Sequence, residues 1–358
     1  MQSMRGRIPK GLALGVLLAA GLGAAEASAA AFLAVELRKP DEKSMRVFKV
    51  DTATKKALVS REVPSGTSKL SGDRTRFYVT NSDVPTTVFC IRTSDLTIQE
   101  RFEIPDELSG VGLEFLFVHP TTGLVYLTST FGSMPNKVIV ADPLKKTIVE
   151  KLRAPAGHTV KGGFTYDRKR DWVYVNSSAP FAIDGMTQRI VHVIDLDGLL
   201  TKPPVDLRRG YFRILRAALY PLPGGKLLID PDLRVEPQLP PVPPMLLLYD
   251  PDRESVVRRS GPLPPLGGRA LSQDGTRFVA ATGPDASTGV VIDTSTLGIL
   301  HSVTFPEPAR VFVPAPDGQG LWMVARSGKV YRLDDQTGQV LEPIPLPFPV
   351  YTIITSAK

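Results

Sequence analysis

The chain has 358 residues, of which 42% are hydrophobic and 22% are charged. This composition is typical of a folded globular protein and excludes an intrinsically disordered chain. The formal net charge of +7 fits an anionic partner such as a lipid surface, a nucleic acid or a small carboxylate, and it also fits ordinary solubility.

Residues 1–30 have the pattern of a secretory signal peptide. Three basic residues lie within the first ten positions, and an apolar stretch follows from Gly11 to Ala25. The segment ends in small residues suited to cleavage. This apolar stretch is short for a membrane span. We therefore predict cleavage near Ala27 to Ala30 and a periplasmic or secreted mature protein without a membrane span.

From residue 31 onward, short β-rich runs are separated by Gly, Pro, Asp and Asn, and one unit recurs. Each copy has a turn, a strand, a variable loop, a strand that ends in an acidic turn, and a further strand that ends near proline. The first of these strands recurs as Phe77–Thr80, Val125–Thr128, Val173–Asn176, Leu227–Asp230, Phe278–Ala281 and Leu321–Val324. The turns recur at Val50-Asp51, Ile91-Arg92, Ala141-Asp142, Ile194-Asp195, Tyr249-Asp250, Ile292-Asp293 and Leu333-Asp334.

The spacing of these turns, about 41 to 55 residues, is the length that a four-stranded propeller blade requires. The first unit lacks an innermost strand, and Val350–Thr355 is a candidate strand without a partner. We therefore predict an all-β fold over residues 31–358, a seven-bladed β-propeller of four-stranded antiparallel blades. The C-terminal strand joins the N-terminal blade and closes the ring. A stack of β-sandwiches is the alternative.

The segments Phe77–Asn81 and Val173–Asn176, together with the Ile-Asp and Val-Asp turns, resemble the YVTN-repeat propellers. That family consists of exported or surface-associated bacterial and archaeal proteins, and the resemblance covers residues 31–358. The chain is more distantly similar to the propeller subunits of quinoprotein amine dehydrogenases and to propeller lactonases. The resemblance implies a fold and export, and it does not imply an activity.

Charged residues occur near the start of several innermost strands, where the central channel opens. The position of Gly66 in blade 2 corresponds to Glu114 in blade 3, Arg216 in blade 5 and Arg310 in blade 7. In blade 4 the corresponding residue is Gly162, and Lys161 comes directly before it. In blade 6, Arg269 lies two residues further along the strand. We predict that the four cations form a basic collar that attracts an anion, with Glu114 as a counter-charge, because guanidinium groups grip carboxylates and phosphates in two places. Scattered solvated arginines are the alternative, since a one-residue slip turns a side chain away from the channel.

Long insertions between the second and third strands are expected in blades 3, 4 and 5, over residues 129–136, 177–188 and 231–244. They open on the same face as the collar. We predict that this face binds a protein partner or a small anionic ligand. Insertions that are tolerated without a role are the alternative.

Residue types that commonly act in catalysis or metal binding, such as histidine and cysteine, are few in this chain. Four histidines lie far apart in sequence, and only His158 is expected at the channel mouth. No calcium loop, zinc motif, phosphate-binding loop or nucleophile elbow occurs. Cys90 is the only cysteine, which excludes an intrachain disulfide, and its apolar neighbours predict a buried thiol. We predict no bound metal and no cofactor, and we assign no catalytic residue.

Two functional hypotheses remain from the sequence. The leading one is an exported, non-catalytic propeller that acts as a binding or protein-interaction module in the cell envelope. The alternative is an enzyme or enzyme subunit, either with a lactonase-like or lyase-like site at the channel mouth or as the propeller subunit of a quinoprotein amine dehydrogenase. Nucleic-acid binding is not expected, because aromatic residues do not gather among basic ones outside the short Tyr211–Arg213 segment.

Overall fold

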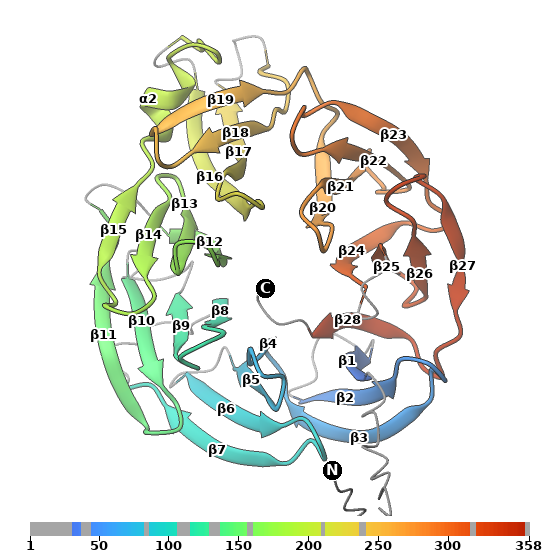
Figure 1. Ribbon diagram of the computed structural model, residues 1–358. Helices are drawn as coiled ribbons and strands as arrows, with labels where there is room; N and C mark the ends of the chain where they lie inside the picture. Colours follow the sequence, from blue (N-terminus) through green and yellow to red (C-terminus); the bar gives the residue numbers. More distant parts are fainter. Residues whose placement is uncertain are drawn as a thin grey trace, which may run out of the picture.

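A computed structural model describes residues 31–36, 44–81, 86–105, 115–128, 137–155, 160–208, 212–235, 241–315 and 320–354. Seven four-stranded antiparallel sheets form a closed ring around a central channel (Figure 1). This arrangement confirms the predicted seven-bladed β-propeller. The predicted signal peptide lies outside the described residues, and within them no helix has the length and apolar character needed to cross a membrane.

The strands follow the chain order blade by blade. Blade 1 contains β1 (Ala31–Glu36), β2 (Ser44–Asp51), β3 (Ala57–Pro64) and β28 (Val350–Ile354). Blade 2 contains β4 (Thr67–Leu70), β5 (Arg76–Thr80), β6 (Thr87–Arg92) and β7 (Ile98–Glu103). Blade 3 contains β8 (Phe115–Val118), β9 (Val125–Thr128), β10 (Lys137–Asp142) and β11 (Thr147–Arg153). Blade 4 contains β12 (Val160–Asp167), β13 (Trp172–Ser177), β14 (Phe181–Asp184) and β15 (Ile190–Val193).

The remaining blades repeat this plan, with one short helix before blade 5. That helix is α2 (Leu196–Leu200). Blade 5 contains β16 (Phe212–Pro221), β17 (Leu227–Val235), β18 (Leu247–Asp250) and β19 (Ser255–Arg259). Blade 6 contains β20 (Leu266–Leu271), β21 (Arg277–Thr282), β22 (Thr288–Asp293) and β23 (Ile299–Thr304). Blade 7 contains β24 (Ala309–Pro314), β25 (Leu321–Ala325), β26 (Val330–Leu333) and β27 (Val340–Ile344).

The core lies between neighbouring blades. Every residue of β25 is buried, whereas no residue of the outer strand β11 is. A second strand is covered on both faces by the adjoining blades, and an outermost strand is not. Seven apolar clusters fill the seven interfaces between blades. Burial of these side chains is therefore what holds the ring together.

The two ends of the chain share blade 1, as the sequence predicts. Leu33 of β1 pairs with Ile354 of β28, and Ala34 pairs with Ile353. Phe32 also contacts Trp322 of blade 7 edge-to-face, with ring centroids 4.9 Å apart. The innermost strand of blade 1 therefore comes from the C-terminal segment, and the ring has no open edge.

The turn between the third and outermost strands has the same geometry in every blade. Its fifth residue has a positive φ, at Lys55, Leu96, Lys146, Gln188, Glu254, Leu297 and Gly338. In most copies an aspartate at the first position accepts backbone N–H groups, as Asp293 does from Ser295 and Thr296 at 2.9 and 2.8 Å. This repeated turn fixes the register of each blade.

In blade 4 the third strand and its turn lie earlier in the sequence than predicted. The third strand is β14, which ends at Asp184, so the predicted turn at Ile194-Asp195 is wrong. Asp184 accepts the backbone N–H of Thr187 at 2.6 Å. Asp195 instead caps α2 and accepts the backbone N–H of Gly198 at 3.0 Å. Each aspartate accepts the backbone N–H of the residue three positions later in the chain. The pairs Ile183-Asp184 and Ile194-Asp195 therefore give the same signal in the sequence.

The predicted insertions change accordingly. Residues 177–188 are not a loop, because they contain β14 and its turn, and only residues 178–180 connect it to β13. Residues 231–244 are also not a single loop, because β17 continues to Val235. Proline is tolerated at position 231 because β17 pairs there only with β16, through Ala217. The pairing of β17 with β18 stops at Ile229, so no strand on that side needs an N–H from Pro231. The third segment, residues 129–136, lies outside the described residues.

Candidate functional site

A cavity of about 1220 Å³ occupies the central channel. Its wall consists of the last residues of the innermost strands and of the turns that lead from them to the second strands. The cavity therefore opens at the end of the channel opposite the start of the innermost strands, where the collar is predicted. A volume of this size accommodates a ligand of small-molecule dimensions.

The cavity wall has a ring of corresponding positions, one from each of several blades. Strand register places Lys69, Phe117, Thr165, Tyr220 and Ile354 at the same level of the innermost strands. All of them line the cavity. Four of the five are uncharged, so the wall at this level is an apolar and hydroxyl surface with one ammonium group.

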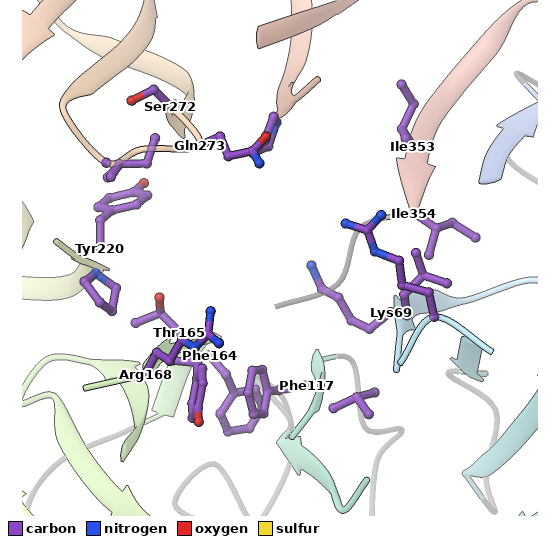
Figure 2. Close-up of a pocket in the computed structure, with 18 of the residues that line it drawn as sticks. Lys69, Phe117, Phe164, Thr165, Arg168, Tyr220, Ser272, Gln273, Ile353 and Ile354 are labelled. Atoms are coloured by element: carbon purple, nitrogen blue, oxygen red, sulfur yellow. The ribbon is translucent and has the colours of Figure 1, made fainter. Parts of the chain in front are cut away.

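Lys69 reaches from β4 toward the middle of the cavity (Figure 2). Its side chain is half-buried, and within the described part of the chain no hydrogen bond or ion pair involves its Nζ. Burial lowers the pKa of Lys69 below the ordinary lysine value. A cation in this setting gains free energy from an anionic ligand, because no neighbouring group supplies a counter-charge.

The turns at the rim add further cations. Arg168 points into the cavity from the turn of blade 4 (Figure 2). Arg74 lines the cavity from the corresponding turn of blade 2. Among the described residues neither guanidinium group has a hydrogen-bond or ion-pair partner. Five cationic and three acidic side chains line the cavity in total.

The acidic groups of the rim are already engaged by their own turns. Asp73 accepts the hydroxyl protons of Ser71 at 2.6 Å and Thr75 at 2.8 Å. Burial opposes ionisation, but these hydrogen bonds outweigh it and the pKa of Asp73 is lowered. Asp274 has the same arrangement in blade 6. Asp167 forms an ion pair with Arg170 at 2.8 Å. The lining keeps a net positive charge because its cations outnumber these carboxylates.

A second polar group lies beside the cavity, between blades 3 and 4. Tyr166 lines the cavity and donates its hydroxyl proton to Asp171 at 2.5 Å. His119 Nε2 lies 3.1 Å from the same carboxylate. A Cβ at Gly185 would lie 2.4 Å from this nitrogen, so only glycine fits there. His119 is fully buried, and the group connects two blades rather than presenting an acid or base to the cavity.

The described collar residues are ion-paired or hydrogen-bonded within the protein and lie outside the lining of this cavity. Arg216 Nε lies 3.2 Å from Asp232 Oδ2. Arg269 forms an ion pair with Asp230. Neither arginine lines the cavity.

Arg310 does not line the cavity either. It donates to the backbone carbonyl of Arg326 at 3.0 Å and lies 4.9 Å over the ring of Tyr351. Glu114 and His158 lie outside the described residues, and the side chain of Lys161 is not described. The side chains of three of the six predicted residues are thus undescribed, so both the grouping of the collar and its role in binding stay predictions.

Arg269 and Asp230 form part of the support behind the wall. Burial raises the pKa of Asp230 to about 6, opposed by the charge of Arg269. Burial also raises the pKa of Tyr220 to about 12, with Asp230 adding to the shift. Asp230 compensates Arg269 through their ion pair, and Lys69 is the uncompensated cation that the innermost strands contribute to the wall.

The sequence contained a signal for Lys69 that the predicted collar did not use. Aligning the innermost strands places Lys69 in a column with Phe117, Tyr220 and Val313. A lysine at a position that is apolar in the other copies of the repeat points to a function more strongly than arginines near strand starts do. The packing of the repeated blades accounts for the apolar residues, and it does not account for the lysine.

No group of three or more His, Cys, Asp or Glu side chains in the described ranges is placed to hold a metal ion. Cys90 is buried as predicted, and burial raises the pKa of its thiol. The chain matches no family model, and no curated protein is significantly similar to it. The site is therefore interpreted from its own geometry.

Proposed function

We propose that this chain is an exported, non-catalytic binding propeller of the cell envelope, with degenerate YVTN-type repeats, whose channel holds a small ligand. The observation that carries this proposal is the cavity of about 1220 Å³, into which Lys69 and Arg168 point without a protein partner among the described residues. Buried polar groups in proteins are generally paired. An unpaired ammonium group in a concave apolar wall is therefore typical of a surface that a ligand completes.

Apart from Lys69, the ionisable groups around the cavity favour binding over turnover. General acid-base catalysis needs a group that reaches the substrate and has a pKa near the working pH. His119, the described histidine beside the cavity, is fully buried and faces Asp171. The rim residues Asp73 and Asp274 have lowered pKa values and accept hydrogen bonds from their own turns. The wall thus offers charge and apolar surface to a ligand.

The test is to block the channel. Thr165 faces the cavity (Figure 2) and is half-buried, so Thr165→Trp should fill part of it. Thr147→Trp, on the exposed outer strand β11, is the matched control. The mature chain and both variants are incubated with a small-molecule extract and separated from unbound compounds by gel filtration. Mass spectrometry then identifies what each protein retains.

We expect the wild type and Thr147→Trp to retain the same compound, chemically unchanged, and Thr165→Trp to lose it. Equal retention by Thr165→Trp would contradict a channel site. Conversion of the compound by the wild type would instead support the enzymatic alternative.

A further inference from the structure

We propose that the channel selects an organic monoanion, in which one carboxylate or sulfonate group is attached to an apolar body, with the anionic group at Lys69. This inference rests on the proposed function and names the chemical class of its ligand. It follows from three properties of the cavity: one uncompensated cation at depth, an apolar wall around it, and further cations nearer the mouth.

The first step concerns the charge at depth. Lys69 is the single cation that the innermost strands contribute at this level, where their other residues lining the cavity are Phe117, Thr165, Tyr220 and Ile354. Lys49 also lines the cavity, from the third strand of blade 1. Burial without a counter-ion raises the free energy of the charged amine, in agreement with its lowered pKa. A single anionic group placed there removes this cost through a charge-assisted hydrogen bond. The one cation of the innermost strands is matched by one anionic group.

The second step concerns the apolar wall. Phe164, Leu222 and Leu271 line the same cavity as Lys69 and are only half-buried. A small inorganic anion would leave these side chains facing water and would gain little from them. A ligand with an aromatic or aliphatic body buries them, and each Å² of apolar surface removed from water contributes about 25 cal/mol. The wall therefore favours an organic anion over free phosphate or sulfate.

The third step concerns the mouth. Arg168 follows Thr165, the counterpart of Lys69, by three residues, so its backbone lies further toward the rim than that of Lys69. Arg74 also lines the rim. The rim carboxylates Asp73 and Asp274 are held by their own turns. The resulting positive field draws an anion toward the channel and repels a metal cation or an amine.

The experiment uses two fluorescent probes with the same body. 8-Anilinonaphthalene-1-sulfonate carries one sulfonate group, and N-phenyl-1-naphthylamine is its neutral analogue. Both are titrated into the mature wild-type chain and into Lys69→Met, Thr165→Trp and Lys56→Met. Lys56 is exposed on the turn between β2 and β3, so its substitution removes one positive charge without touching the cavity.

We expect the wild type to bind the sulfonate probe more tightly than the neutral one. Lys69→Met should weaken binding of the sulfonate probe about tenfold, as expected for the loss of one charge-assisted hydrogen bond, and should leave binding of the neutral probe unchanged. Lys56→Met should behave as the wild type, and Thr165→Trp should bind neither probe. Decanoate should displace the sulfonate probe, and inorganic phosphate at the same concentration should not.

Several results would overturn the inference. Equal affinity for the two probes, or unchanged affinity for the sulfonate probe in Lys69→Met, would show that charge does not select the ligand. Displacement by phosphate would show a bare anion site. Fluorescence that Thr165→Trp does not reduce would place the probes outside the channel. If the neutral probe alone binds in a manner that Thr165→Trp abolishes, the inference fails and the proposed binding function stands.

Discussion

At the scale of single residues, His119 connects blades 3 and 4 and makes the interface between them sensitive to pH. Its Nδ1 accepts the backbone N–H of Thr122 at 3.2 Å, which assigns the proton of the neutral ring to Nε2, facing Asp171. Burial lowers the pKa of His119, and the charge of Asp171 offsets this only in part. The folded state therefore binds fewer protons than the unfolded chain below about pH 6.5. By linkage, this histidine reduces stability as the pH falls.

His119→Phe tests this assignment. The variant should lose about 1–3 kcal/mol of unfolding free energy at pH 7, because the N–H groups of the turn lose their acceptor. Between pH 7 and pH 5 its stability should fall less than that of the wild type, by up to about 2 kcal/mol. Urea unfolding at both pH values measures the two effects. His301→Phe, at a half-buried position on β23, is the control. An unchanged difference between pH 7 and pH 5 in His119→Phe would show that this histidine does not carry the effect.

At the scale of elements, the repeated turn after each third strand stores local strain. Lys146, its fifth residue in blade 3, has a φ of 55°, a conformation that costs a non-glycine residue about 1–2 kcal/mol. Lys146→Gly should therefore raise the unfolding free energy by about 0.5–1 kcal/mol once the entropy of glycine is included. The exposed ion pair with Glu100 that it loses contributes little.

The neighbouring residue supplies the matched control for this prediction. Lys145 belongs to the same turn and is not among the residues with positive φ. Lys145→Gly should therefore lower the melting temperature, since glycine there brings flexibility without relief of strain. If both variants lower the melting temperature equally in calorimetry, the turn is not strained at its fifth residue.

The strands and turns also show which parts of the fold can be predicted from the sequence and which cannot. Second strands were predictable because the adjoining blades bury them on both faces, so they are continuous apolar runs such as Leu321–Val324. Blade 4 was misread because Asp184 in a hairpin turn and Asp195 at a helix start use the same side-chain acceptor. The extension of β17 was missed because Pro231 looks like a strand end, and only the pairing partners show that its missing N–H faces no strand.

At the scale of the whole molecule, the fold was predictable and the position of the cavity was not. Ring closure follows from counting strands, because blade 1 lacks an innermost strand and one C-terminal strand has no partner. The depth of Lys69 depends on which end of the channel is wide, and that is set by side-chain packing around the whole ring. Charges near strand starts, such as Arg216 of blade 5 and Arg269 of blade 6, are instead compensated by Asp232 and Asp230, which both lie on β17 of blade 5.

Closure of the ring should control the stability of the entire protein. β28 contributes the buried side chains of Val350, Ile353 and Ile354. Each fully buried side chain of this size is worth about 1.5–3 kcal/mol, so their loss approaches the whole stability of a typical domain, about 5–15 kcal/mol. Deleting residues 350–358 would also expose the free edge of β1 to pairing with other molecules.

We therefore expect the truncated chain to lose its cooperative unfolding transition and to elute from gel filtration as soluble aggregates. A chain that lacks only residues 355–358 should keep the midpoint of the full protein, because β28 and its pairing with β1 are intact. A synthetic peptide spanning residues 344–358, added during refolding, should restore a monomeric propeller by supplying the missing strand. A truncated monomer with an unchanged unfolding midpoint would mean that the contacts between blades 7 and 1 and between blades 1 and 2 hold the ring without the shared blade.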